Sequence, residues 1–287
     1  MTAERDIRWD PRAMRDLARL ELAPEELEDA LVRALAQGQM VAMFQPQVHL
    51  PGLGLRGFEV LVRWRHPRFG LLRPQRFIRL AEHCEAAVEL DLFALREAER
   101  LAEALGDGAD GLSISVNASP RAAARAGYAD RVAALARRLG ESGIALVAEI
   151  TERSPLLAWR RTLRNLRKIR RAGARVAVDD FGSGYASFGI VRRLELNEIK
   201  IDRSLLRDPD PEAAAILTAI LEMARAIAVE VVAEGVENEE QHRLLVALGC
   251  PLAQGYFYGH PLPLADAARL AREAAAASRG RRRSSCA

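Results

Sequence analysis

The stretch RVAVDDFGSGYASF, residues 175–188, combines an apolar strand-like run with a polar end that contains two adjacent carboxylates, Asp179 and Asp180. A helix-like segment precedes it, at 155–171, and another, at 185–193, follows. The same succession of a helix and an apolar strand recurs along the chain, which makes it the basis of the predicted fold. Adjacent negative charges repel each other, so this strand end also indicates that the two carboxylates bind something.

Apolar runs typical of strands occur eight times. They cover residues 40–50, 55–64, 112–117, 144–150, 175–180, 197–202, 229–235 and 251–257. Only the turn PGLG separates the first two, which predicts that they are antiparallel neighbours. Helical segments separate most of the others, which predicts a parallel sheet. They lie near 74–84, 90–105, 120–139, 155–171, 185–193, 212–227 and 239–248. The predicted fold is therefore α/β, a modified (β/α)8 TIM-type barrel with an antiparallel first strand.

Composition is that of an ordinary globular protein, with 287 residues, 49% hydrophobic, 28% charged and a net charge of +3. The cysteines Cys84, Cys250 and Cys286 are scattered, which argues against a disulfide framework or a thiolate zinc site. No apolar run is long enough to span a bilayer, and the first residues lack the apolar core of a signal peptide. We therefore expect a cytoplasmic protein with no membrane span.

Three segments are expected along the chain. Residues 1–30 form an N-terminal helical extension, 31–275 the barrel domain, and 276–287 a basic disordered tail. The tail contains RGRRR, at 279–283, which we interpret as a solvated end rather than a site for DNA or RNA.

Polar side chains gather where the predicted strands end. In chain order they are Gln45, Glu59, Asn117, Glu149, Asp179, Asp180, Lys200, Glu234 and Gln254. The carboxyl ends of barrel strands meet at one face, so these groups are expected to converge there. Several buried carboxylates need compensating positive charge. Oxygen ligands without histidine pairs are typical of hard cations, which predicts two divalent cations, Mg²⁺ or Mn²⁺.

Each of these residues taken alone also has a structural interpretation. Glu149 could be a carboxylate at a helix start, Asn117 a turn residue, and Lys200 an ion-pair partner of Asp179. The set as a whole is what indicates a site. GLGLRG, residues 52–57, matches the letters of a dinucleotide-binding loop, but a strand rather than a helix follows it, so a hairpin turn is predicted.

The order of the motifs FQPQ, GFEVLVRWRHP, ISVNAS, AEITE, VDDFGSGYASF, IKID, AEGVE and QGYFYG resembles the EAL-domain phosphodiesterases, which hydrolyse cyclic di-GMP to linear pGpG. The resemblance runs over residues 31–271, nearly the whole chain. It implies a cyclic-guanylate-specific phosphodiesterase that lowers this second messenger, and a homodimer.

The resemblance also assigns roles to residues. The implied metal ligands are Glu59, Asn117, Glu149, Asp179, Asp180 and, through water, Glu237. Lys200 resembles the lysine that orients the attacking water, and Glu234 the general base; with Glu59 they form the implied catalytic set. The implied contacts to substrate or to the metal shell come from Gln45, Arg63 and Gln254, and Glu152 resembles the glutamate that anchors the loop 180–188.

Two alternatives stay open at this point. The same fold could bind cyclic di-GMP as an effector with little or no catalysis, or the barrel could be a magnesium-dependent lyase or racemase with Lys200 as base. The chain departs from the family pattern at Val60, where the signature reads EVL, and at Ser183, Ala186 and Phe188 of the loop. Any upstream regulator is unknown from the sequence.

Overall fold

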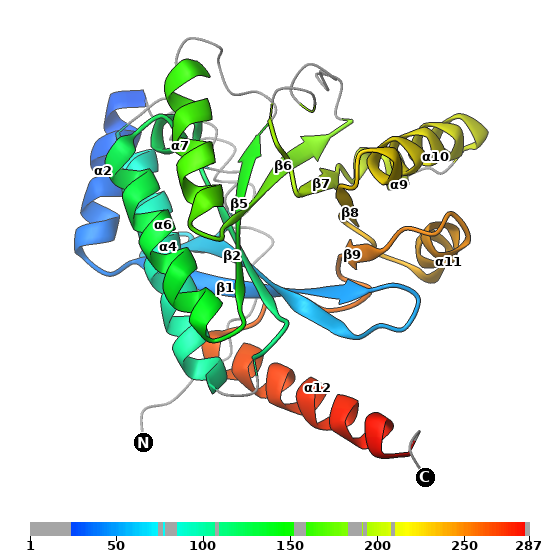
Figure 1. Ribbon diagram of the computed structural model, residues 1–287. Helices are drawn as coiled ribbons and strands as arrows, with labels where there is room; N and C mark the ends of the chain where they lie inside the picture. The colour runs from blue at the N-terminus through cyan, green and yellow to red at the C-terminus, as the bar shows by residue number, and fades with distance from the viewer. Residues whose placement is uncertain are drawn as a thin grey trace.

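The computed structural model describes residues 24–73, 77, 85–106, 109–151, 159–182, 191, 194–207 and 210–284. Its strands form a single sheet that closes on itself (Figure 1). They are β1 Met40–His49, β2 Leu55–His66, β3 Gly70–Leu72, β4 Ser113–Asn117, β5 Ala145–Thr151, β6 Arg175–Phe181, β7 Glu198–Ile201, β8 Glu230–Ala233 and β9 Leu252–Gln254.

Closure is made by the first hairpin. The strand order is β1-β9-β8-β7-β6-β5-β4-β2-β3, and β1 also pairs with β2, so eight strands form the barrel and β3 lies outside it on β2. β1 runs antiparallel to both of its barrel neighbours, whereas the pairs from β2 through β4 to β9 are parallel. The predicted modified TIM-type barrel with an antiparallel first strand is confirmed.

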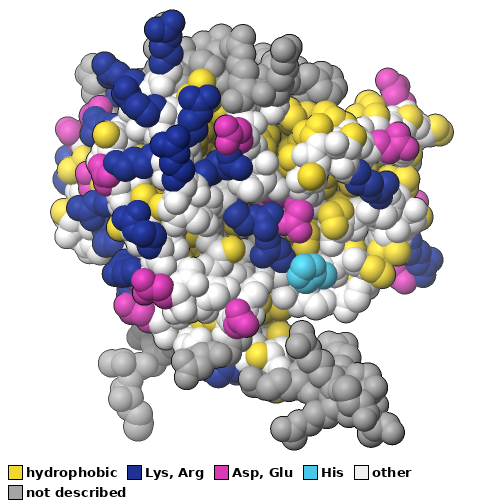
Figure 2. Space-filling model, in the orientation of Figure 1, with side chains coloured by type: hydrophobic (Ala, Val, Ile, Leu, Met, Phe, Trp, Pro, Cys, Tyr) yellow, Lys and Arg dark blue, Asp and Glu magenta, His cyan; other side chains and the backbone are white. Residues whose placement is uncertain are grey.

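Helices cover the outside of the barrel (Figure 1). They are α2 Pro24–Ala36, α4 Ala86–Leu105, α5 Pro120–Ala123, α6 Ala126–Glu141, α7 Trp159–Arg171, α9 Ser204–Arg207, α10 Pro211–Ala226, α11 Glu239–Ala247 and α12 Leu264–Ser284. The buried faces of α4 and α6 repeat every three or four residues, as in amphipathic helices that pack on a core. Figure 2 shows basic side chains gathered over α7. None of the described helices is long and apolar enough to cross a membrane.

Several boundaries differ from the prediction. The predicted helix at 120–139 is two helices, because Ser119 caps α5 through Ala122 N–H and Arg125 then adopts an extended conformation before α6. Strand β3 and the short helix α9 were not predicted. The expectation of a disordered tail from residue 276 is wrong at its start, since α12 continues to Ser284. Alanine and arginine, which dominate that segment, are strong helix formers.

Three other predictions fall wholly or partly outside the described residues. These are the N-terminal extension up to residue 23, most of the helix predicted at 74–84, and most of the segment 183–193 with its short helix. Apart from the helical start of the tail, the division into an extension, a barrel domain and a tail stays a prediction.

Strand register places the predicted site residues in neighbouring layers of the barrel. Gln45 of β1 is paired with Glu59 of β2, and Asn117 of β4 with Glu149 of β5. Since paired residues on adjacent strands point to the same side of a sheet, Gln45 and Glu59 face one way, as do Asn117 and Glu149. The register therefore brings the polar side chains of each pair next to each other.

Close approach of β2 and β4 requires glycine at position 57. A Cβ atom there would lie 2.0 Å from the carbonyl oxygen of Ser113. We predict that Gly57→Ala lowers the free energy of unfolding by about 3 kcal/mol, the cost of overpacking a rigid interior. Urea denaturation measures this change in the free energy of unfolding. Gly54→Ala is the matched control, because a Cβ at Gly54 meets nothing within 4 Å; equal stability of the two variants would contradict the steric account.

Candidate functional site

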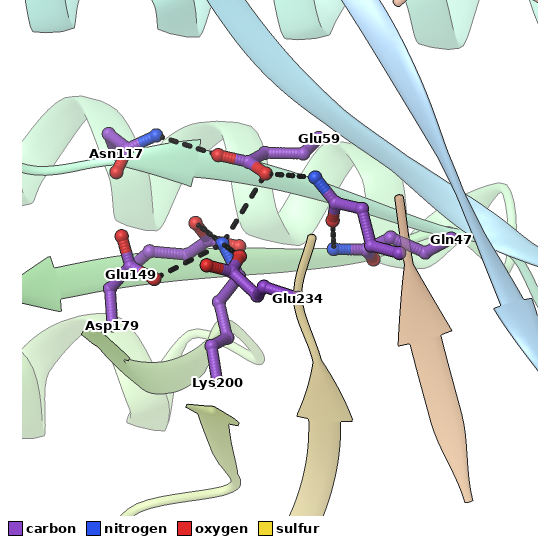
Figure 3. Close-up of polar contacts among 8 residues, drawn as sticks. Gln47, Glu59, Asn117, Glu149, Asp179, Lys200 and Glu234 are labelled. Atoms are coloured by element: carbon purple, nitrogen blue, oxygen red, sulfur yellow. Dashed lines mark hydrogen bonds and ion pairs between the residues drawn. The ribbon is translucent and has the colours of Figure 1, made fainter. Parts of the chain in front are cut away.

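The ammonium of Lys200 lies at the centre of a group of carboxylates inside the barrel (Figure 3). Its Nζ is 2.6 Å from Glu149 Oε2 and 2.6 Å from Glu234 Oε1. It is 3.4 Å from both Glu59 Oε2 and Asp179 Oδ1. These four acids come from β2, β5, β6 and the residue after β8, while Lys200 belongs to β7. We call these five residues the Lys200 cluster.

Amide groups hold Glu59 in a fixed orientation. Asn117 Nδ2 donates to Glu59 Oε1 at 3.0 Å, and Gln254 Nε2 donates to Glu59 Oε2 at 2.5 Å. Gln47 Nε2 in turn donates to Gln254 Oε1 at 2.9 Å. Both oxygens of Glu59 therefore have partners, and the chain of amides extends across the barrel to β1 (Figure 3).

The two adjacent carboxylates are brought together by an irregularity within β6. The strand does not end at Asp180, as the predicted range 175–180 has it, because β6 continues to Phe181. Instead, the register with β7 shifts between Val178 and Phe181, and Asp180 has a left-handed backbone with φ of 58°. Oxygens of Asp179, Asp180 and Glu234 consequently lie within 4.8 Å of one another.

Electrostatics in the Lys200 cluster are dominated by burial and by mutual charge. Burial lowers the pKa of Lys200, but the surrounding carboxylates, Asp179 first, outweigh it and raise the pKa well above its usual value. Burial raises the pKa of Glu149 and of Glu234 well above the ordinary carboxyl value, although Lys200 opposes it. Burial also raises the pKa of Glu59. The Lys200 charge and the hydrogen bonds from Gln254 and Asn117 outweigh burial, so the pKa of Glu59 is lowered.

The cluster has the donor set that a hard divalent cation requires. One ammonium faces four carboxylates, and Asp180 adds a further one beside Asp179. Two buried oxygens, Glu149 Oε1 and Asp179 Oδ1, have no hydrogen-bond partner; the 3.4 Å contact of Asp179 Oδ1 with Lys200 is an ion pair only. Carboxylate and amide oxygens without partners are suitable ligands for Mg²⁺ or Mn²⁺.

The remaining predicted site residues are placed less centrally. Gln45 is buried on the same side of β1 as Gln47. Arg63 is buried, and its Nη1 donates a hydrogen bond to the Val62 carbonyl oxygen at 2.9 Å. Glu237 is exposed, and no contact among the described residues joins its side chain to the cluster. Glu152 lies outside the described residues.

Arg63 has the properties of an anion-binding residue. Burial lowers the pKa of its guanidinium, and no carboxylate of the described residues forms an ion pair with it. A buried guanidinium without a carboxylate partner is compensated well by a bound phosphate group.

Gln47 is the member of the amide chain that the sequence analysis missed. It stands two residues after the predicted Gln45 and therefore shares its face of the strand. That spacing was a signal for Gln47, but nothing local showed which of the two glutamines reaches Gln254.

Comparison with known proteins agrees with this geometry. The EAL domain family matches residues 28–261. The chain is 33% identical over 257 residues to the cyclic di-GMP phosphodiesterase RocR of Pseudomonas aeruginosa, covering 86% of this chain and 65% of that relative. It is 37% identical over 243 residues to the cyclic di-GMP phosphodiesterase NbdA of the same bacterium, covering 84% of this chain and 31% of NbdA. The chain thus spans about two thirds of one relative and about a third of the other.

Solved structures show the same fold. The phosphodiesterase PaMucR in complex with c-di-GMP is 35% identical, with a TM-score of 0.74 over 83% of this chain and 98% of that one. The EAL enzyme Bd1971, in a form bound to cAMP and cyclic-di-GMP, has a TM-score of 0.80 over 90% of this chain and 72% of that one. At 24% identity the second likeness shows the fold alone.

The raised pKa of Glu149 predicts a pH dependence of stability. The folded protein holds this proton more tightly than the unfolded chain, whose carboxyl has the ordinary value of 4.5. The stabilisation is therefore fully present below that value and is lost as pH rises through the folded pKa. With a metal chelator in the buffer, the stability of Glu149→Gln relative to the parent should increase as the pH is raised from about 5 to about 8, because only the parent loses this stabilisation.

Urea denaturation at both pH values measures this difference. The exposed Glu240→Gln is the matched control. A stability difference between Glu149→Gln and the parent that stays constant with pH, or that falls as pH rises, is incompatible with a buried, proton-retaining Glu149.

Proposed function

This chain belongs to the EAL domain family, and we propose that it is a phosphodiesterase that hydrolyses cyclic di-GMP to linear pGpG and so lowers the second messenger. The proposal rests on the Lys200 cluster. In it, four carboxylates from separate segments of the chain lie within ion-pair distance of one buried lysine. The names of RocR, NbdA and PaMucR support the choice of substrate.

The acidic groups of the cluster are the proposed ligands of two divalent cations, Mg²⁺ or Mn²⁺. The ligands would be Glu59, Asn117, Glu149, Asp179 and Asp180, with Glu237 retained as a prediction from the family resemblance. Divalent cations, when bound, offset the negative charge of a phosphodiester and make water a better nucleophile at neutral pH.

Lys200 and Glu234 are the proposed groups for handling water and its proton. Lys200 stays charged because of its raised pKa, so its ammonium donates hydrogen bonds that hold an attacking water. The Glu234 side chain is 19% exposed, more than the other acids of the cluster, and faces Lys200 at 2.6 Å. Its raised pKa makes Glu234 a stronger base than an ordinary carboxylate, as suits a general base.

Side chains around the Lys200 cluster are the proposed groups that orient the substrate. Arg63 provides for a phosphate a guanidinium that forms no ion pair among the described residues, although the Glu59 charge acts on it, and Gln45 provides an amide on the β1 side. Gln254 is engaged with Glu59 and Gln47, so its proposed role is to position Glu59 rather than to hold substrate alone. The anchoring role of Glu152, the homodimer, the cytoplasmic location and any regulator stay predictions.

Substitution of the central residues tests the proposal. Purified protein with Mg²⁺ or Mn²⁺ should convert cyclic di-GMP to pGpG, as followed by chromatography of the products. Glu59→Gln and Lys200→Met should each lower the turnover rate by roughly 10³-fold, the range expected for loss of groups that handle the proton or the charge. Glu240→Gln, exposed on α11, is the control and should keep the parent rate.

Each alternative has its own outcome in this assay. Tight binding of cyclic di-GMP with either cation but without turnover would favour an effector of the same fold. Parent turnover that survives in Glu59→Gln and in Lys200→Met would place the chemistry elsewhere in the chain. Proton exchange in a carboxylate substrate, with no hydrolysis, would favour the lyase or racemase.

A further inference from the structure

Helix α7 concentrates positive charge on the outer wall of the barrel. Its sequence WRRTLRNLRKIRR contains seven basic residues and no acidic one. The spacing of Arg160, Arg164, Arg167 and Arg171 is i, i+4, i+7 and i+11, which places all four in one stripe along the helix. At a rise of about 1.5 Å per residue this stripe is about 16 Å long. On the opposite side, Leu166 and Ile169 are buried in the core.

The arginines of this stripe are exposed and lack carboxylate partners. We define the arginine face as Arg160, Arg161, Arg164, Arg167 and Arg171, all of which are exposed (Figure 2). No carboxylate of the described residues forms an ion pair with any of them. The other two cations of the helix are paired and lie beside the stripe, Lys168 with Asp130 of α6 and Arg170 with Glu195.

Exposed arginines on other helices include paired ones and, like Arg207 of α9, ones without an ion pair among the described residues. Arg243 of α11 pairs with Glu239, and Arg269 of α12 pairs with Asp266 and Glu273. Neighbouring like charges on a helix destabilise it. The arginine face therefore carries a local repulsion that an external polyanion would relieve.

The side-chain types on the arginine face indicate which class of polyanion it would bind. Arginine recognises phosphate through a fork of two donors. Among the α7 side chains whose exposure the structure describes, at 160–171, the exposed ones are arginine and lysine only, which offer charge but no aromatic surface on which bases stack. The exposed large hydrophobic residues of the described chain also lie elsewhere, at Val32, Leu53, Ile216, Ile227, Tyr256 and Phe257. A second copy of the same face would be repelled.

We propose that the arginine face binds the protein peripherally to an anionic phospholipid surface. Clusters of four to eight basic residues on a helix are typical of such binding, and each contributes about fivefold to the affinity. Binding is electrostatic rather than by insertion, because none of the exposed large hydrophobic side chains of the described residues lies on α7. Helix α7 lies on the barrel wall beside α6 (Figure 1).

Vesicle sedimentation of the full chain tests this proposal. The probes are vesicles of phosphatidylcholine alone and of phosphatidylcholine mixed with phosphatidylglycerol. The parent should sediment with the mixed vesicles only, and high salt should release it, because salt screens exposed charges. The triple variant Arg160→Gln, Arg164→Gln and Arg167→Gln should bind roughly 100-fold more weakly, about fivefold for each arginine.

The matched control removes the same charge from other helices. Arg207→Gln, Arg243→Gln and Arg269→Gln lie on α9, α11 and α12 and should leave vesicle binding near the parent level. Equal binding by the triple variant and the parent would overturn the proposal, as would equal binding of the parent to both vesicle types. The second comparison needs no variant and therefore holds even if a variant folds poorly.

Nucleic acid is the competing partner in this experiment. Duplex DNA and single-stranded RNA are added as separate probes at the same salt concentration. Failure to bind mixed vesicles together with arginine-dependent binding of either nucleic acid would show that the class of partner is wrong.

Discussion

The burial of one ammonium among four carboxylates is the constraint on which the rest of this structure depends. Lys200 is fully buried, and its position requires acids from β2, β5, β6 and the end of β8 to meet within ion-pair distance. A barrel is suited to this demand because its parallel strands end at a common face. The amides Asn117, Gln254 and Gln47 then fix Glu59, so that the geometry is held by hydrogen bonds as well as by charge.

The two ends of the barrel differ in how their charges are balanced. At the end where the parallel strands begin, Arg56 and Arg175 both pair with Glu230, and Arg175 lies 3.9 Å from Glu198. Cations and anions are present there in similar number, as expected for a structural end of the fold. At the Lys200 end four carboxylates face one ammonium. Buried carboxylate oxygens without a hydrogen-bond partner occur at both ends, so it is this excess of negative charge that favours cation binding at the Lys200 end.

The sequence allowed the barrel to be predicted because apolar runs and helical segments alternate with regular spacing, and it allowed Glu59, Glu149 and Lys200 to be predicted because each ends or lies within such a run. Details that depend on contacts between distant segments were not accessible in the same way. Gln47 meets Gln254 across 207 positions of the chain. The left-handed backbone of Asp180 was also missed, because it reflects the register shift between β6 and β7 rather than a local propensity for glycine or asparagine.

Anomalous diffraction from crystals grown with Mn²⁺ tests the central claim most directly. The account predicts two manganese peaks within the Lys200 cluster, in contact with oxygens of Glu59, Glu149 and Asp179, and with Asp180 bound to one of them. A crystal with manganese absent from this cluster, and with Lys200 still in contact with all four carboxylates, would contradict it.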